Sequence, residues 1–318
     1  KQSFVFENVS AHPIPSLLRD FSAPVKLEYN FTQAQLITLL GHDEDTYCRW
    51  QAAQALGMRL IRAHMANPEA FNVPLAYLDA MSNTLNDTRL DKALIANLLG
   101  VPSVNEVIES MDVADVDGAQ AARKAVLAAL SRHLLDGLIS TYKALELKTY
   151  HWNPEDNAKR SLKNACLGLL MYTDSPEVTA LAQTQFTSAN NMTDQFAALA
   201  ALASGHDRDA AAAALEAFYT QWQDNELVVN KWLGLQAAQT RGDTLATVKA
   251  LTEHKAFDYT NPNNVYSLIR TFGSNLVHLH RADGASYTFM RDQIAKLNDI
   301  NPQVGSAMAR TLMRWRQF

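Results

Sequence analysis

Helix signals run almost without interruption from Thr32 to the C-terminus, and this feature constrains the fold more than any other. Apolar residues recur at spacings of three and four, which places them along one face of a helix. Capping boxes begin at Thr32 and Ser103, and Asn–Pro pairs at 153–154, 261–262 and 301–302 are typical helix starts. Glycine (12) and proline (10) are scarce in 318 residues, which favours helices joined by short loops.

This pattern predicts a mostly α fold, an irregular α-solenoid of the HEAT or armadillo kind built from antiparallel helix pairs. No exact repeat at a fixed period is present. The strongest helical pattern runs from about 117 to 148, and we expect one long helix there, with Asp117 as its cap. Its apolar stripe comprises Leu127, Leu130, Leu134, Leu138, Tyr142 and Leu145.

The N-terminal segment differs from the rest of the chain. Phe4 and Phe6 alternate with Val5 and Glu7, and residues 25–30 alternate apolar and polar side chains. Both period-two patterns predict half-buried strands. Pro13 and Pro15 lie between them and forbid a regular ladder or helix there. Two strands alone are marginally stable, so we expect them to complete a sheet whose other strands lie elsewhere.

Composition excludes several classes of function. The net charge is −5 and no basic stripe is present, so we expect no nucleic-acid partner. No stretch approaches the roughly 18–20 apolar residues that span a bilayer, so we expect no membrane partner and a cytoplasmic protein. Cys48 and Cys166 are expected to be buried thiols. Lys1 follows no initiator Met, which suggests that it is internal to a longer polypeptide.

No catalytic or metal-binding constellation is visible in the sequence. The His-Glu-x-x-His spacing of helical zinc sites is absent, and His278 and His280 would diverge on a helix. Residues 115–118 resemble part of an EF-hand loop, but Val113 and Lys124 then occupy ligand positions. We therefore expect no catalytic residue, no metal ligand and no cofactor in this chain.

Several strings nevertheless resemble the bacterial aminopeptidase N family, the alanyl aminopeptidases of the gluzincin class of zinc metallopeptidases. They occur in the family's order and cover nearly the whole chain: PSLLRDFSAPVKLEY (15–29), PSVNE (102–106), AKRSLKNACL (158–167), ANNMTD (189–194), KW (231–232), NPN (261–263) and NPQV (301–304).

The resemblance implies a domain organisation. Residues 1–29 would be the last strands of a β-sandwich domain plus a linker, and residues 30–318 the C-terminal helical domain. In the family this domain closes over the catalytic domain, so the zinc, its ligands and the general base would lie upstream of Lys1. The family also continues past Phe318 with further helices. Whether this chain itself counts as an enzyme is left open.

The resemblance also implies one substrate contact. Gln303 of the NPQV string would line the pocket for the first side chain of a peptide substrate. The family carries arginine at the positions of Tyr266 and Ala307, and Arg270 or Arg310 could compensate. The partners would be the upstream catalytic domain and, in the parent protein, peptides. The alternative is a free-standing helical-repeat scaffold that binds a protein partner.

Overall fold

The computed structural model describes residues 3, 5–25, 27–109 and 111–318, and it is helical from residue 33 onward. Its N-terminal half contains α1 (Gln33–His42), α2 (Thr46–Ala66), α3 (Leu75–Leu85), α4 (Lys92–Leu98), α5 (Val104–Ile108), α6 (Val116–His133), α7 (Leu135–Ala144) and α8 (Pro154–Leu170). Its C-terminal half contains α9 (Pro176–Ser188), α10 (Met192–Ser204), α11 (Arg208–Trp222), α12 (Glu226–Ala237), α13 (Thr244–Thr252), α14 (Pro262–Val265), α15 (Thr271–Gly273), α16 (Leu276–Leu279), α17 (Ala285–Ile300) and α18 (Pro302–Ala309).

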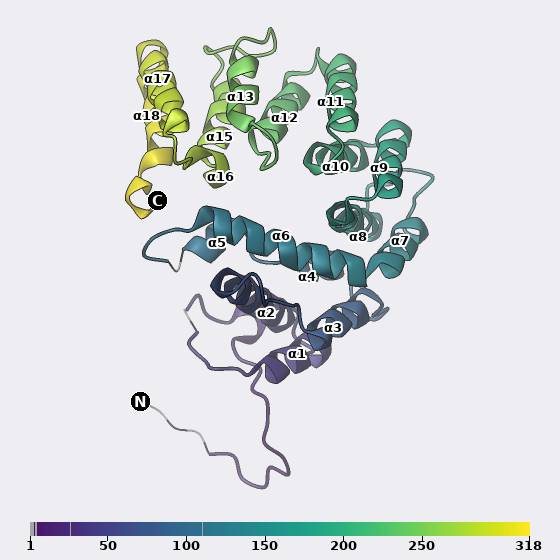
Figure 1. Cartoon of the computed structure of the whole chain (residues 1–318). Helices are drawn as coiled ribbons and strands as arrows, with labels where there is room; N and C mark the ends of the chain where they lie inside the picture. Colours follow the sequence, from purple (N-terminus) through teal and green to yellow (C-terminus); the bar gives the residue numbers. More distant parts are fainter. Residues whose placement is uncertain (1–2, 4, 26, 110) are drawn as a thin grey trace.

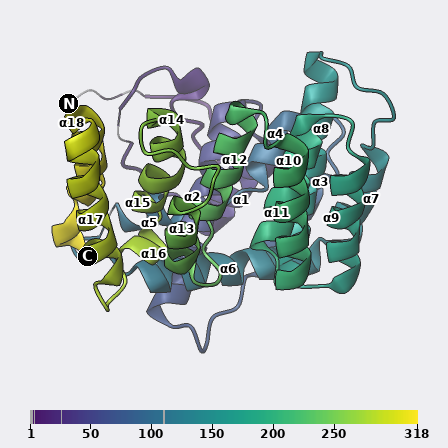
Figure 2. The same ribbon diagram turned by 90° about the horizontal axis from the view of Figure 1, so that it is seen from above.

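Short tight turns complete the element order. They are the 3-10 turns η1 (Arg19–Phe21), η2 (Met171–Thr173), η4 (Arg310–Leu312) and η5 (Trp315–Gln317), and the π-helical segment η3 (Tyr266–Arg270). Successive helices pack side by side in a curved array that runs from α1 to α18 (Figure 1). Seen from above, the later helices stand roughly parallel to one another across the longer α6 (Figure 2). The prediction of a helical-repeat fold is confirmed.

Local capping explains where many of these helices begin. Thr32 Oγ1 accepts a hydrogen bond from the Gln35 amide at 3.2 Å, and Gln35 Oε1 accepts one from the Thr32 amide at 2.8 Å. The same reciprocal pair joins Ser103 and Glu106. Both capping boxes predicted from the sequence are therefore confirmed, and each satisfies backbone donors that a helix N-terminus would otherwise leave unpaired.

The single long helix expected from about 117 to 148 is wrong. The chain forms α6 and α7, which are separated at Leu134, where φ is −92° and ψ is 4°. The predicted stripe is nonetheless buried along both helices. Because the chain bends at Leu134, α6 packs against α2 and α7 packs against α8. One continuous apolar stripe therefore contacts two different neighbouring helices. The cap is Asp115, whose Oδ1 accepts from the Gly118 amide at 2.8 Å, and not Asp117.

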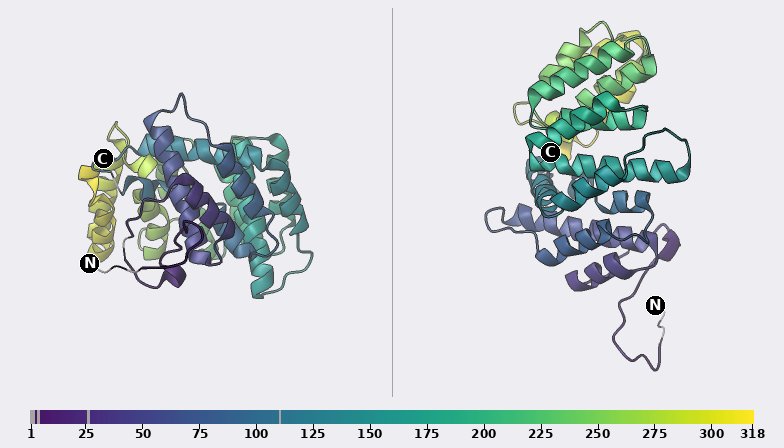
Figure 3. Two further views of the ribbon diagram at one scale, coloured as in Figure 1. Left: turned by 90° about the horizontal axis from the view of Figure 1, so that it is seen from below. Right: turned by 90° about the vertical axis from the view of Figure 1, so that its right-hand side faces the viewer.

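The two predicted strands do not form among the described residues of the N-terminal segment, and residues 4 and 26 lie outside the described part. A strand needs a ladder partner, and the described part of the chain supplies none. Phe6 and Val25, which alternate toward the expected sheet face, are exposed by 82% and 57%, whereas Leu27 is half-buried. The first part of the segment extends away from the array in an irregular path, and η1 packs against α2 (Figure 3).

The array also curls back on itself. Helix α16 packs against α6, and Gln120 Nε2 donates to Thr240 Oγ1 at 3.1 Å. Near the C-terminus, Gln317 Nε2 donates to the carbonyls of Ile108 and Met111, each at 2.9 Å. These contacts join the C-terminal end of the helical array to α5 and α6, so its curvature is stabilised by more than the packing of neighbouring helices.

Candidate functional site

Helix α18 carries the side chain that the family resemblance singles out. Asn301 caps this helix, and its Oδ1 accepts from the amides of Gln303 at 3.1 Å and Val304 at 3.4 Å. Pro302 occupies the first helical position, where its missing N–H costs nothing. Gln303 therefore lies in the first turn of α18, and its exposed side chain has no hydrogen-bond partner within the described part of the chain. It is free to contact a ligand.

Close packing fixes the position of α18. Val304 and Met308 are buried, and the helix packs against α17 and η3. Gly305 faces the backbone of α17, where an added Cβ would lie 3.0 Å from the nitrogen of Asn298. The absence of a side chain at this position allows the two helices to approach closely, so the turn that carries Gln303 has little room to shift.

The π-helical segment η3 contains Tyr266, the first of the two positions at which the resemblance implies arginine. Leu268 and Ile269 are buried, and the Arg270 guanidinium lies 5.8 Å from the centre of the Tyr266 ring. Arg270 and Arg310 are both exposed, and neither forms an ion pair with another described residue. The structure therefore places a free cation directly beside Tyr266. A π-helical turn is rare and is often found at functional sites, and the sequence pattern gave no signal for it.

The two closely spaced histidines lie in different surroundings, as expected. Burial lowers the pKa of His278. Burial, with a smaller effect from the Arg314 cation, lowers the pKa of His280 to about 4. The His280 ring stacks on Phe318 with 3.4 Å between centroids, and its Nδ1 lies 2.6 Å from the hydroxyl of Tyr287. No group of three or more His, Cys, Asp or Glu side chains could hold a metal ion among the described residues.

Both cysteines are buried thiols, as the sequence predicts. Burial raises the pKa of Cys166 to about 12 and also raises the pKa of Cys48. The Cys48 thiol donates to the carbonyl of Leu17 at 3.2 Å. Because the thiolate is the reactive form, neither residue is suited to nucleophilic catalysis.

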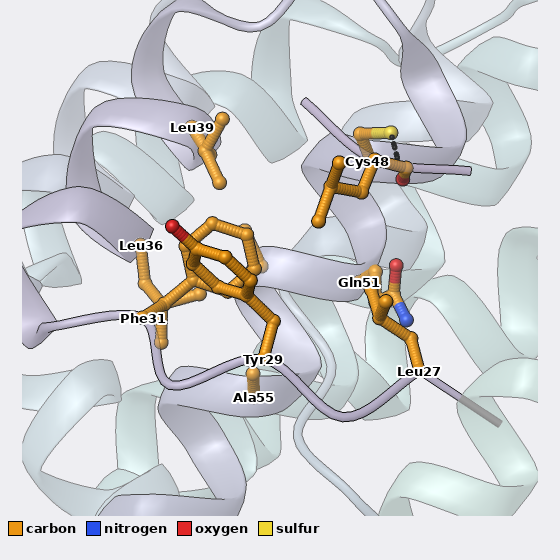
Figure 4. Close-up of a pocket in the computed structure, with 10 residues that line it drawn as sticks. Leu27, Tyr29, Phe31, Leu36, Leu39, Cys48, Gln51 and Ala55 are labelled. Carbon is orange, nitrogen blue, oxygen red and sulfur yellow. Dashed lines mark hydrogen bonds between the residues drawn. The ribbon is translucent and has the colours of Figure 1, made fainter. Parts of the chain in front are cut away.

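An apolar cavity of about 130 Å³ lies where the N-terminal segment crosses α1 and α2 (Figure 4). Leu27, Tyr29 and Phe31 line it from the segment, and Leu36 and Leu39 line it from α1. Sequence reasoning missed this cavity and assigned Leu27 and Tyr29 to a strand. The walls are mostly hydrocarbon, with Gln51, Tyr29 and Cys48 as the lining residues that carry polar groups, so the cavity can hold an apolar group. Burial raises the pKa of the Cys48 thiol, which makes it a poor nucleophile.

Comparison with known proteins shows the family to which the helical part of this chain belongs. The family model described as DUF3458_C, a domain of unknown function with ARM repeats, matches residues 33–318. This chain belongs to the DUF3458_C family. The related DUF3458 model, described as an Ig-like fold, matches residues 1–30. None of the helices in the described residues is long and apolar enough to cross a lipid bilayer.

Curated relatives of this DUF3458_C chain are named aminopeptidase N, which confirms the resemblance drawn from the sequence strings. The Escherichia coli protein is 38% identical and the Haemophilus influenzae protein 36% identical, and each match covers 100% of this chain. The chain spans 37% of the length of each of these relatives. The crystal structure of Legionella pneumophila aminopeptidase A in complex with aspartic acid matches with a TM-score of 0.90 and 29% identity, over 98% of this chain and 38% of that one.

Proposed function

We propose that this chain is the C-terminal part of a zinc-dependent aminopeptidase, which removes N-terminal residues from peptides. The observation that carries the proposal is the 38% identity to an aminopeptidase N over the full length of the chain. In this proposal, residues 1–29 belong to the end of a preceding β-sandwich domain and residues 30–318 form a helical cap. The cap closes over the active-site cavity, controls access to it and performs no catalysis alone.

The residues of this chain do not fit a zinc site. Its described His, Cys, Asp and Glu side chains form no cluster of three that could hold a metal ion. Zinc would therefore be bound by the catalytic domain that precedes this chain in the parent protein. The contribution of the helical part would be shape: a curved array that excludes large substrates and places a few side chains at the edge of the cavity.

Gln303 is the side chain that we propose to contact the substrate. It is exposed, lacks an internal hydrogen-bond partner within the described residues and lies in a helical turn fixed by the close approach at Gly305. A neutral amide can accept or donate a hydrogen bond without favouring one charge. Arg270 and Arg310 would supply the positive charge that the family carries at the positions of Tyr266 and Ala307, and would attract the carboxylate end of a peptide.

The test restores activity from two separate polypeptides. The catalytic segment of the parent protein is expressed alone and mixed with this chain, and cleavage of an alanyl chromogenic substrate is measured. We expect this chain to raise the cleavage rate, and Gln303→Ala to raise KM about three- to tenfold, the loss of about one hydrogen bond. Gln183→Ala, which removes an exposed glutamine on α9, is the matched control.

Two results would contradict the proposal. One is cleavage that this chain leaves unchanged while it binds some unrelated protein, which would support a free-standing scaffold. The other is one tightly bound zinc per isolated chain in metal analysis, because the capping role requires the metal to lie elsewhere.

A further inference from the structure

The backbone of residues 17–21 adopts an unusual conformation at the junction between the two family matches. Leu18, Asp20 and Phe21 have φ values of 59°, 55° and 49°, which lie in the left-handed region. This region is unfavourable for residues that carry a Cβ, and especially for large apolar ones. Such a conformation persists only where surrounding contacts determine it, so the segment must be held from outside.

Two buried carboxylates between α1 and α2 hold it. Arg19 Nη1 lies 3.2 Å from Asp43 Oδ1, and the amide of Asp20 donates to Asp45 Oδ2 at 2.8 Å. The Asp20 amide that makes this bond belongs to a residue in the left-handed region. On the same side, the Cys48 thiol donates to the carbonyl of Leu17. Asp43 and Asp45 are only 7% and 6% exposed, whereas the Arg19 side chain is 50% exposed, so these bonds are shielded from water on the side of the two aspartates.

Asp43 and Asp45 are themselves held in place by hydrogen bonds that do not involve residues 17–21. Asp45 Oδ1 accepts from the amide of Cys48 at 2.8 Å as the N-cap of α2, and Asp43 Oδ1 accepts from the amide of Asp45 at 2.9 Å. Burial raises the pKa of Asp45, but the backbone hydrogen bonds from Cys48 and Asp20 outweigh burial and hold that pKa below its ordinary value. The carboxylate is therefore charged at neutral pH, and hydrogen bonds to a charged acceptor are the stronger kind.

These contacts connect residues that belong to two different family matches. The segment lies inside the Ig-like match at residues 1–30, whereas both aspartates lie inside the ARM-repeat match at 33–318. A further hydrogen bond runs from Arg59 Nη2, in the ARM-repeat match, to the carbonyl of Phe31, which lies in the short gap between the two matches, at 2.5 Å. We propose that residues 17–21 and the pair Asp43 and Asp45 form an interdomain clamp, which fixes the direction in which the Ig-like segment leaves the helical array.

The clamp makes Asp43 and Asp45 positioning residues. They act through the orientation of the preceding domain and touch no substrate. Their value to catalysis rests on the proposed capping function, because a cap works only when it is held at one angle to the catalytic domain. The existence of the clamp does not depend on that function and can be tested in this chain alone.

Asp45→Asn separates the clamp from the helix cap. Asparagine is as good an N-cap as aspartate, so its Oδ1 can still accept from the Cys48 amide. Its NH₂ group, in place of Oδ2, cannot accept from the Asp20 amide. Asp91→Asn is the matched control, because Asp91 caps α4 through Oδ1 alone, toward the amides of Ala93 and Leu94.

Asp20→Gly tests the clamp in the opposite direction. Glycine adopts the left-handed region without penalty and keeps the amide donor, so the clamped conformation should become more populated. The Asp20 side chain is exposed and forms no hydrogen bond among the described residues. Asp20→Asn removes the same charge while still tolerating the left-handed region, and therefore serves as its control.

The measurement is hydrogen–deuterium exchange of the peptide spanning residues 17–24 in the intact chain. We expect exchange at least tenfold faster in Asp45→Asn than in the wild type or Asp91→Asn, and slower exchange in Asp20→Gly than in Asp20→Asn. Arg19→Gln, which removes the ion pair to Asp43 and the exposed hydrogen bond from Arg19 to Ser16, should accelerate exchange in the same peptide to a smaller extent and provides a second variant that leaves the core intact.

Wild-type exchange at the rate of an unprotected peptide would overturn the clamp, as would Asp45→Asn exchanging at the wild-type rate. Faster exchange in Asp20→Gly than in Asp20→Asn would also count against it. None of these readouts involves peptide cleavage, so the clamp can fail while the complementation of activity succeeds, and the reverse.

Discussion

A buried ion pair between Lys163 and Asp194 ties α8 to α10. Lys163 Nζ lies 2.7 Å from Asp194 Oδ2, and the two side chains are only 7% and 8% exposed. Asn164 donates to the other oxygen of Asp194 at 2.9 Å, and Gln185 on α9 donates to Asn164 Oδ1 and to the carbonyl of Asp194. The network is well satisfied, which is the condition under which a buried charge pair is tolerated.

Asp194→Leu should therefore be strongly destabilising. It leaves the Lys163 ammonium buried without a counter-charge, and we expect the free energy of unfolding to fall by about 3–5 kcal/mol in chemical denaturation. Adding Lys163→Met to this variant should recover much of the loss, since the second charge is removed as well.

Arg291→Met is the control for this pair. Arg291 binds Asp292, both side chains are exposed (71% and 57%), and removing such a surface pair should cost about 1 kcal/mol or less. If Asp194→Leu cost no more than this control, the buried pair would contribute nothing beyond an ordinary surface interaction.

At the residue scale, local rules predicted much of what the structure contains. The capping boxes at Thr32 and Ser103 act within three residues along the chain, so the sequence alone specifies them. The cap of α6 shows where such a rule fails: Asp115 and Asp117 both fit the pattern, and backbone geometry selects Asp115. The network around Asp194 could not be predicted, because its members come from separate helices.

At the scale of elements, two helical glycines should respond in opposite ways to alanine. Gly168 in α8 has nothing within 4 Å of the position that a Cβ would take, whereas Gly305 in α18 faces the backbone of α17. Gly168→Ala should raise the free energy of unfolding by about 0.5–1 kcal/mol, because glycine is entropically unfavourable in a helix. Gly305→Ala should lower it by about 1 kcal/mol or more, because the Asn298 backbone cannot rotate away.

Chemical denaturation of the two variants measures this difference, and each serves as the control for the other. An equal stabilisation by both would mean that α17 and α18 are separated by more space than the structure shows. A shift of α18 in the Gly305 variant should also raise KM in the complementation assay, since Gln303 lies two residues earlier in the same helix.

The elements in which the structure differs from the sequence pattern share a physical cause. Period-two alternation at residues 25–30 describes a side-chain pattern, but a strand also requires a neighbouring strand, and none is supplied by the described part of the chain. The pattern across Leu134 stays in register through the bend, so periodicity cannot reveal the break. The π-helical turn at Tyr266–Arg270 is set by packing against α12 and α18, which no local pattern encodes.

At the scale of the whole molecule, the curl of the array depends on contacts between distant segments. Gln317 and Ile108 are bonded across more than half of the chain, and Phe318 stacks on His280. In an open solenoid each helix packs only against its neighbours. The order of the helices along the chain therefore does not predict contacts between distant segments. The sequence predicted the stacked helices, but not the contacts that join the C-terminal end to α5 and α6.

The stacking of Phe318 on His280 should make the stability of the folded chain depend on pH. Burial and the Arg314 cation lower the pKa of this residue from 6.5 to about 4 in the folded chain. Between these two values the unfolded chain binds a proton that the folded chain does not, so stability rises with pH across this window. The stabilising effect is complete above pH 6.5 and is lost as the pH falls toward about 4. Below that value His280 contributes no further change.

His280→Phe tests this, because phenylalanine can stack on Phe318 and does not titrate. We expect the melting temperature of the wild type, relative to that of the variant, to fall as the pH is lowered from about 6.5 to about 4. Taking the difference cancels the other titrating groups, including His278, whose pKa burial also lowers and which both proteins share. Parallel profiles across the window would show that His280 is not buried beside Phe318 in solution, and that the C-terminal segment does not close the array in the way the structure describes.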